Sequence, residues 1–383
     1  MEILELIQPP LFDKGIPKKK EDKYGTANRY IRKTESSDLG PGKLWMGSIG
    51  LGLHGGLTST NQRAACICRP PIQEQSMSSL TRIHTLFGEE EFWVVADSQE
   101  FLDECSHQGL NTARIHELST LPRNSIIFSF SNNAAKLTLE IAKATPVKKS
   151  VFCAAQVFDP SFSSANYSLH LLLNSDFRKA LEKQRFFLNM LNSHDSFFLS
   201  GEDTFGKVTL NCQAEPYALI KEDVSENFIH SAAEFFEVHY AHMNIQERCP
   251  FCVNGVLKIS GILTVLRKAN PQLPNDIRAR LELLSESVAR AGGLLSVVEN
   301  KVTSLQADNE EHIETLKSAA GIRGLGLTEF AIGVNEDIAA FIDYKVNSQM
   351  NEGINGVHLA IGDGSSGFHI DFLSPDVNVT TVA

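Results

Sequence analysis

Short apolar runs alternate with longer amphipathic runs through the middle of the chain. The short runs are rich in Val, Ile and Phe and are bounded by polar turn residues, a pattern that favours strands. The longer runs repeat apolar residues at helical spacing. Strands are therefore expected at 92–97, 111–117, 125–130 and 150–155, and helices at 99–109 and 132–145. This alternation predicts an α/β domain with a mainly parallel sheet.

A longer amphipathic run at 176–191 ends this half, and the pattern then changes to strand-like runs separated by polar turns. We therefore expect a poorly assignable segment at 1–85, an α/β domain at 86–195 and a mixed α/β domain at 196–383. In the second half, residues typical of helix ends and turns give several further predictions. They are a helix with Ile277, Leu281, Leu284 and Val288 inward and a stop at Gly292, a turn at Glu299-Asn300, a helix from Asp308 to Gly321, and a helix from Asn335 through Asp343.

Composition narrows the class of protein. The 383 residues suffice for about two domains. A formal net charge of −11 repels phosphate backbones, so nucleic acid is not an expected partner. No apolar stretch reaches the ~20 residues of a membrane span, and the acidic start lacks the basic residues of a secretory signal. These features favour a cytoplasmic protein without membrane contact, with a homodimer as one option for its assembly.

Two features of the first 85 residues invite a functional interpretation. Gly50, Gly52 and Gly55 have the bare spacing of a dinucleotide loop, but no helix pattern or acidic residue follows, so a flexible turn is expected. Lys18, Lys19 and Lys20 are expected on a solvated surface.

Seven cysteines in 383 residues do not form a disulfide framework. Those expected to be small buried hydrophobes are Cys66, Cys68, Cys105, Cys153 and Cys212.

The most informative segment is 356–373, where two strand-like runs flank Asp363-Gly364. Asp-Gly between alternating apolar residues predicts a β-hairpin. With a two-residue turn, His358 lies directly opposite His369, and Asp371 shares their face because side chains alternate. A four-residue loop would pair His358 with Asp371 and still gather all three. Only an odd loop length or a bulge would scatter them.

Two imidazoles and a carboxylate on one face are ligands that Zn²⁺ or Fe²⁺ prefers, so these residues are candidate metal ligands. The alternative interpretation is that they are ordinary strand residues that face water. Glu329 is a further candidate ligand, because it lies in an apolar run that predicts burial. A buried carboxylate needs a cation or hydrogen-bond donors, and backbone N–H groups at a helix start are the other way to satisfy it.

The order of these motifs resembles the thermostable leucyl aminopeptidase family, two-domain cocatalytic metallopeptidases related to dihydroxypyridine ring-cleaving dioxygenases. The matching stretches are E-x-x-I-G-x-N at 329–335, G-V-H-L-A-I-G at 356–362 and H-x-D at 369–371. The resemblance covers residues from about 195 to the end. It places metal ligands at Glu329, His358, His369 and Asp371, with Glu237 as the earlier glutamate and Glu234 as its rival.

The resemblance implies a metal-dependent aminopeptidase-like hydrolase that acts on a peptide or small-molecule substrate, with zinc, cobalt or manganese as the metal. Glu329 is the implied catalytic residue, with Glu237 as an alternative proton carrier. The chain departs from the family at Ser365, where the peptidases have Tyr, and in a shorter loop after His358. Two alternatives therefore stay open. One is a non-haem iron ring-cleaving dioxygenase, and the other is a degenerate scaffold that binds a peptide without cutting it.

An insertion after Glu237 contains a second possible metal site. Cys249-x-x-Cys252 can place two thiolates on one ion, and the upstream His239 and His242 could complete a structural zinc site. A redox dithiol and plain packing thiols are the alternatives, because no thioredoxin-like pattern surrounds the pair.

Overall fold

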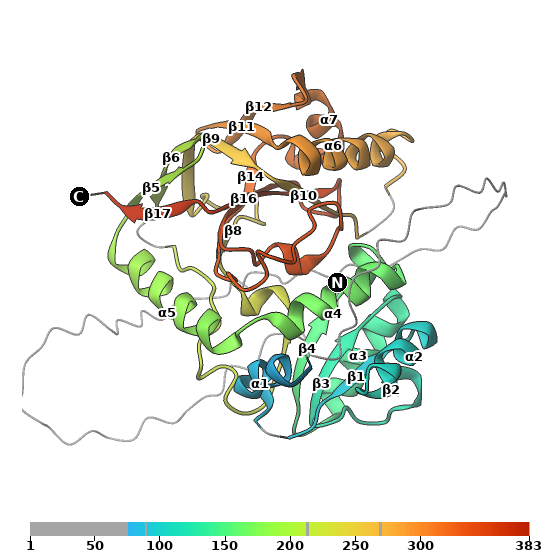
Figure 1. Cartoon of the computed structure of the whole chain (residues 1–383). Coiled ribbons are helices and arrows are strands. Elements are labelled where there is room, and N and C mark those ends of the chain that lie inside the picture. The colour runs from blue at the N-terminus through green and yellow to red at the C-terminus, as the bar shows by residue number, and fades with distance from the viewer. Residues whose placement is uncertain (1–75, 89, 212–213, 268–269, 383) are drawn as a thin grey trace, which may run out of the picture.

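A computed structural model describes residues 76–382 except 89, 212–213 and 268–269 (Figure 1). The predictions for Gly50, Gly52 and Gly55, for the Lys18–Lys20 run, and for Cys66, Cys68 and Cys212 lie outside the described residues. Cys105 and Cys153 are buried, as predicted. No helix within the described ranges is long and apolar enough to cross a membrane.

The first half of the chain forms a five-stranded parallel sheet, which confirms the predicted α/β class. The strand order is β2-β1-β3-β4-β7. Its strands are β1 (Trp93–Ala96), β2 (Asn111–Arg114), β3 (Asn124–Phe128), β4 (Lys149–Cys153) and β7 (Phe228–Ser231). The helices of this half are α1 (Ser76–Phe87), α2 (Gln99–His107), α3 (Asn132–Ala144), α4 (Phe162–Asn174) and α5 (Phe177–Ser193). Strand β7 comes from beyond residue 195, so the chain returns to this sheet after beginning the next one.

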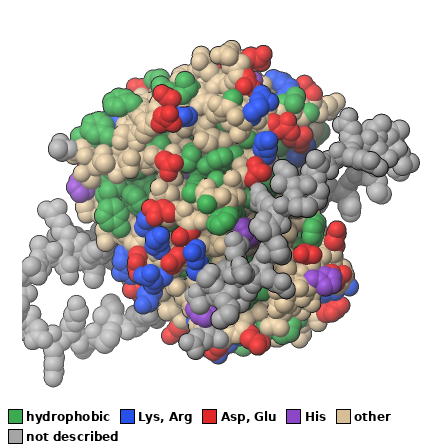
Figure 2. Space-filling view, viewed as in Figure 1, with side chains coloured by type: hydrophobic (Ala, Val, Ile, Leu, Met, Phe, Trp, Pro, Cys, Tyr) green, Lys and Arg blue, Asp and Glu red, His purple; other side chains and the backbone are tan. Residues whose placement is uncertain are grey.

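Side-chain caps explain where four of these helices begin. Ser98, Ser131, Ser161 and Asp176 each accept a hydrogen bond from the backbone N–H three residues later, which satisfies a donor that the helix leaves unpaired. On the outside of the molecule, Lys and Arg side chains of α5 alternate with acidic ones (Figure 2).

The second half contains two antiparallel sheets. The seven-stranded sheet has the order β13-β12-β11-β9-β6-β5-β17, and the five-stranded sheet has the order β10-β16-β15-β14-β8. The first comprises β5 (Ser196–Gly201), β6 (Thr204–Leu210), β9 (Phe251–Ile259), β11 (Gly293–Val298), β12 (Lys301–Ala307), β13 (Glu310–Glu311) and β17 (Asn378–Thr381). The second comprises β8 (Glu237–Ala241), β10 (Gly261–Val265), β14 (Leu327–Gly333), β15 (Gly356–Ile361) and β16 (His369–Pro375).

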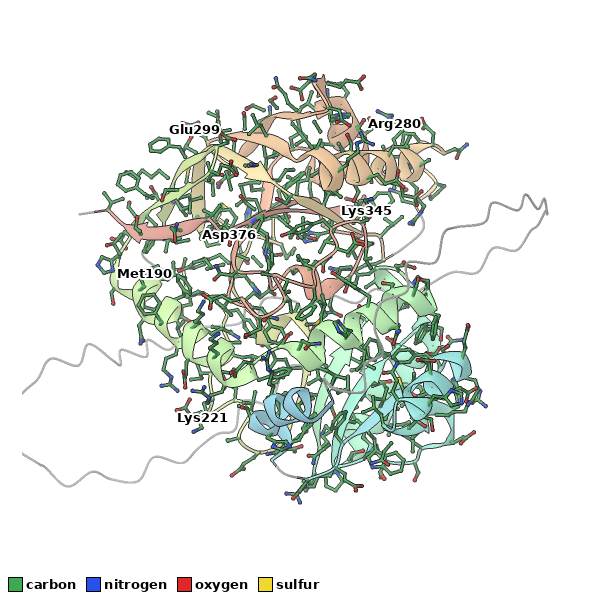
Figure 3. All side chains as sticks on the ribbon, viewed as in Figure 1. Met190, Lys221, Arg280, Glu299, Lys345 and Asp376 are labelled. Carbon is green, nitrogen blue, oxygen red and sulfur yellow. The ribbon has the colours of Figure 1, made fainter. Side chains whose placement is uncertain are left out.

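One apolar core joins both antiparallel sheets to α6 (Ile277–Ala291) and α7 (Ile313–Ala319). The predicted inward face of α6 is confirmed, because Ile277, Leu281, Leu284 and Val288 are all buried. Arg280, on the same helix, donates from Nη2 to Thr315 Oγ1 of α7 at 2.8 Å (Figure 3). The predicted turn between β11 and β12 is also confirmed, since Glu299 and Asn300 both have left-handed φ angles, 48° and 62°.

Two helix predictions are wrong. Asp308 and Asn309 adopt left-handed φ angles of 51° and 64° and form the turn between β12 and β13, so α7 starts only at Ile313. Asn335 does not cap a helix, and the residues after it form turns. Its Nδ2 atom instead donates to Ser175 Oγ at 2.7 Å. Short 3-10 helices occupy η3 (Ile115–Glu117), η4 (Ala155–Val157), η5 (Ala233–Phe235), η6 (Gly321–Arg323) and η7 (Gln349–Asn351).

The segment between β14 and β15 ties the two halves together. Its Val334, Ile338 and Met350 belong to the core of the parallel-sheet half. Asn347 accepts a hydrogen bond from Thr264 N at 3.0 Å and donates to Thr264 O at 2.8 Å, which caps the edge of β10. The same amide donates to Phe158 O at 3.1 Å, on the other half of the molecule.

Candidate metal centre

One face of the five-stranded sheet gathers acidic and imidazole side chains. Residues paired across a sheet share a face, so the register fixes which side chains meet. Asp371 pairs with Ala360, and Ala360 pairs with Glu329. In the next row, His358 pairs with Ala331, and Ala331 pairs with His239. The small side chains of the alanines leave room between the polar ones.

The other face of the same strands is apolar. Residues at the alternate positions belong to the core shared with α6 and α7: Tyr240, Ile262, Phe330, Leu359 and Phe372. Burial of this face pins the register, because a slip by one residue would move every apolar side chain to the wrong side. The core therefore holds the polar face in place.

The hairpin brings the predicted residues to one face, but in a different register. His358 lies opposite Leu373, not opposite His369 or Asp371. The predicted two-residue turn is wrong because Asp363 Oδ1 accepts the backbone N–H groups of Ser365 and Ser366, both at 2.8 Å, and closes a longer loop. The register differs by an even number of positions, so the three side chains still share a face, as predicted.

Distances within the cluster centre on Glu329. His358 Nε2 lies 3.5 Å from Glu329 Oε1 and 3.5 Å from Glu237 Oε2. His369 Nε2 lies 3.7 Å from Glu329 Oε2 and 3.0 Å from Asp371 Oδ1. The structure thus brings together all five residues that the sequence singled out, from the four neighbouring strands β8, β14, β15 and β16.

The donor set suits a divalent ion. Two groups have ligand atoms within 4.8 Å of one another, Glu237 with His239 and Glu329, and Glu329 with His369 and Asp371. Glu329 belongs to both. Glu237 Oε2 and Asp371 Oδ2 are buried and have no hydrogen-bond partner in the described part of the chain. A buried carboxylate oxygen without a donor is costly, and a cation would satisfy both.

Electrostatics within the cluster favour charged side chains. Burial lowers the pKa of His358, but the hydrogen bond and charge of Glu329 outweigh it and raise the pKa to about 9. Burial likewise opposes the effect of Glu237 on His239, whose pKa also rises to about 9. The pKa of Glu329 falls, because hydrogen bonding from His358 and the imidazole charges outweigh its burial. Each acid and base thus supports the charge of its neighbours.

The sequence prediction missed or misassigned three cluster residues. It gave His239 to a separate zinc site with Cys249 and Cys252, although its place here could have been found, because it lies two positions after Glu237 and therefore on the same strand face. Arg267 follows Val265, which pairs with His369, by two positions. Burial lowers the pKa of Arg267 to about 8 despite the opposing charges of Asp363 and Glu329.

Glu352 is the third of these residues. Burial and the charges of Asp371, Glu237 and Glu329 raise its pKa well above the ordinary value. Its surroundings therefore disfavour the charged form of this carboxyl group. Its local sequence carries no signal, because a turn segment between two strands delivers it to the cluster.

Glu234, the rival of Glu237, lies outside both potential ligand groups. It is buried in η5, where its Oε2 atom accepts from the Tyr217 hydroxyl at 3.0 Å and lies 3.1 Å from His230 Nδ1. Glu237 is therefore the glutamate that meets Glu329.

The predicted structural zinc site at His239, His242, Cys249 and Cys252 is wrong. Neither ligand group found among the described residues contains His242 or a cysteine. His239 lies on β8 of the five-stranded sheet, whereas Cys252 lies on β9 of the seven-stranded sheet. Cys249 Sγ accepts from Asn300 Nδ2 at 3.3 Å, and His242 Nε2 lies 3.0 Å from Glu247 O. The fold separates these side chains, and both thiols are free.

Comparison with known proteins places the chain in a family. No curated protein matches the sequence. Among solved structures, wild-type AmpT from Thermus thermophilus is similar over 80% of this chain and 96% of its own, at 14% identity and a TM-score of 0.42, a level that carries no argument. The family model for the crocagin biosynthetic protein CgnE/B matches residues 89–382. The chain therefore belongs to the CgnE/B family of crocagin biosynthetic proteins.

Proposed function

We propose that this protein is a metal-dependent hydrolase of peptide or amide bonds. The observation that supports it is the convergence of potential ligands on one sheet face, where Glu329 is common to two groups and His358 lies 3.5 Å from both Glu237 and Glu329. In this proposal, one or two divalent ions are held by Glu237, Glu329, His358, His369 and Asp371. Hydrolysis of an amide bond is compatible with the biosynthetic role that the family name states.

A divalent ion at this position lowers the pKa of a bound water and polarises a carbonyl oxygen. The side chains of the chain supply the remaining functions. Asp371 and Glu237 supply the anionic donors, while His358 and His369 supply neutral nitrogen donors once they lose their protons. Glu329 is the residue to which we assign proton transfer, as the resemblance to the peptidases implies.

Metal content and amide cleavage test this proposal directly. Purified full-length protein should retain zinc, cobalt or manganese through dialysis and release chromophore from aminoacyl amides, and a chelator should stop the release. His369→Ala and Asp371→Ala should each abolish tight metal retention, because each removes a donor from a three-residue group. Glu314→Gln, on the exposed surface of α7 and outside both groups, is the control and should retain metal. Unchanged metal stoichiometry in both ligand variants would overturn the proposal.

A second candidate function is peptide binding without cleavage, and Ser365 favours it. The peptidases that the sequence resembles carry a Tyr at this point, whereas Ser365 is exposed and its backbone N–H is committed to Asp363. Such a protein would bind peptides measurably and release no product.

An iron-dependent dioxygenase, the other alternative, would instead retain iron and consume oxygen with a ring substrate.

A further inference from the structure

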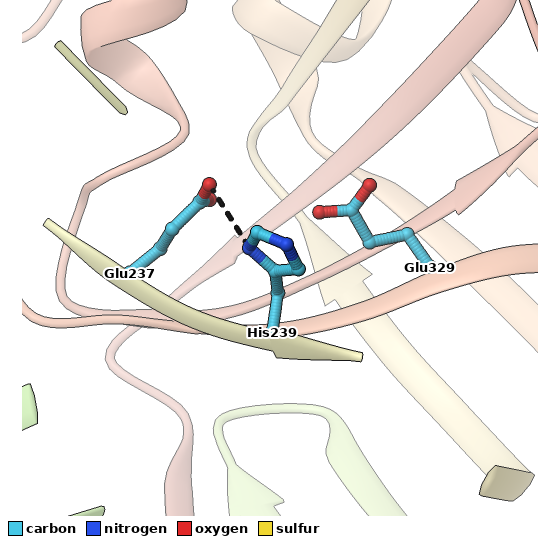
Figure 4. Close-up of side chains that lie close together, drawn as sticks. All are labelled: Glu237, His239 and Glu329. Carbon is cyan, nitrogen blue, oxygen red and sulfur yellow. Dashed lines mark ion pairs between the residues drawn. The ribbon is translucent and has the colours of Figure 1, made fainter. Parts of the chain in front are cut away.

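His239 faces the metal centre from the edge of the five-stranded sheet. It lies on β8 two residues after Glu237 and pairs with Ala331, which in turn pairs with His358. Its side chain is only 20% exposed. Figure 4 shows His239 between Glu237 and Glu329, with all three side chains on the same side of the strands.

The ring of His239 is within reach of both glutamates. Its Nδ1 atom lies 3.3 Å from Glu237 Oε1, and ligand atoms of Glu237, His239 and Glu329 lie within 4.8 Å of one another. Nδ1 is buried and has no hydrogen-bond partner among residues that the structure describes. Two ligands of one tetrahedral zinc ion are about 3.3 Å apart for bonds of about 2 Å, so this spacing suits a shared ion.

Tyr217 fixes the orientation of the His239 ring. The two rings stack with centroids 5.2 Å apart and planes at 28°. The backbones of the same two residues are also joined, with Tyr217 N donating to His239 O at 2.8 Å and His239 N donating to Tyr217 O at 3.0 Å.

Glu234 fixes Tyr217 in turn. Its Oε2 atom accepts from the Tyr217 hydroxyl at 3.0 Å, and His230 Nδ1 lies 3.1 Å from the same oxygen. Ligating histidines in metalloproteins are commonly held by such outer partners, which restrict the ring to one orientation. The buried Glu234, the partly exposed Tyr217 and His239 therefore form one series of contacts that ends at the candidate metal centre.

We propose that His239 is a sixth metal ligand, held in place by Tyr217 and Glu234 as positioning residues. The inference rests on the proposed function and extends it, because the peptidase resemblance accounts for two imidazoles and this chain presents three. The position between Glu237, His239 and Glu329, with His358 adjacent, is rich in nitrogen donors and suits zinc. The position between Glu329, His369 and Asp371 likewise offers two carboxylates and one imidazole, so it can also take zinc.

Zinc titration of the chelator-treated full-length protein tests the assignment, with bound metal measured by elemental analysis and affinity by calorimetry. Wild-type protein should bind two zinc ions per chain, and His239→Phe, which keeps an aromatic ring against Tyr217, should bind one. His239→Asp should regain the second ion, because it restores a donor. His242→Phe is the matched control from the same segment and should still bind two.

The positioning role has a separate readout. Tyr217→Ala should weaken the affinity of one of the two zinc positions about 10- to 100-fold, as outer partners of ligating histidines do, and should leave the other unchanged. A general loss of structure would weaken both, and circular dichroism of each variant identifies that case.

The outcomes separate this inference from the proposed function. If the wild type and His239→Phe bind the same number of zinc ions, whether two or one, His239 is not a ligand, and the hydrolase proposal still stands. Two ions in wild type and one in His239→Phe, without amide cleavage by either, support the ligand and overturn the hydrolase. Wild-type protein that binds no zinc overturns both.

Discussion

At the scale of single residues, the three imidazoles of the site each lie 3.0–3.5 Å from a carboxylate oxygen. Removal of one partner from such a buried pair leaves an uncompensated charge, at a cost of about 3–5 kcal/mol. In the metal-free cluster, protons on the imidazoles compensate the carboxylates. In the proposed metal-bound state the ion would replace those protons, so that metal binding and proton release would be coupled.

This coupling predicts how the stability of the metal-free protein depends on pH. His239 and His358 have a folded-state pKa of about 9, above the ordinary value of 6.5. A raised folded-state pKa means that their contribution to stability is fully present below pH 6.5 and is lost as the pH rises through about 9. Urea unfolding of chelator-treated protein between pH 6 and pH 9.5 should show a falling free energy of unfolding.

A matched variant identifies the groups responsible. His358→Gln keeps a polar side chain at the same place but does not titrate, so it should reduce the slope of stability against pH. Equal slopes in the variant and the wild type would show that His358 does not carry the effect.

At the scale of elements, the alternation of side chains along strands was readable from the sequence, whereas the partners of each strand were not. The shared face of His358, His369 and Asp371 follows from period-two alternation. The register does not, because the loop between them is set by contacts from elsewhere, such as Phe368 N donating to Ala319 O at 2.8 Å. Placing Glu237 beside Glu329 required the sheet order, which local patterns do not encode.

The same loop gives a stability prediction. Gly362 has a left-handed φ of 75°, and a Cβ atom there would lie 1.9 Å from Phe368 O. Gly362→Ala should therefore lower the free energy of unfolding by more than the ~1 kcal/mol of backbone strain alone, and denaturant titration measures the change.

Gly324 provides the control for that measurement. Its φ is 54°, and an added Cβ atom would meet nothing within 4 Å. Gly324→Ala should thus show backbone strain without a collision. Equal losses in the two variants would contradict the argument from the close contact with Phe368.

At the scale of the whole molecule, the two halves are joined through polar contacts as well as apolar ones. Asn347 bonds to Thr264 on one side and Phe158 on the other. Gln349 continues this link, since its Oε1 accepts from Ala154 N at 2.9 Å and its Nε2 donates to Ser231 Oγ at 2.6 Å. The segment that delivers Glu352 to the cluster of acidic and imidazole side chains is thus anchored on the parallel sheet.

Loss of the Asn347 hydrogen bonds should therefore destabilise both halves of the molecule. Asn347→Ala leaves backbone groups of Thr264 and Phe158 without their partner and should lower the free energy of unfolding by about 1–3 kcal/mol. Tryptophan fluorescence in a Trp45→Phe background, which reports on Trp93 in the parallel sheet, and far-ultraviolet circular dichroism should shift together to lower urea concentration. Asn270→Ala, outside this link, is the control, and an equal shift there would contradict the bridging role.

The return of the chain to the parallel sheet through β7 also has a consequence for synthesis on the ribosome. Strand β4 has no neighbour on its outer side until Phe228–Ser231 has emerged, long after the rest of that sheet has been translated. A nascent chain of intermediate length therefore exposes an open strand edge, which is a template for pairing with other chains. Arrested nascent chains that end before residue 228 should accordingly depend on chaperones more than those that extend past it.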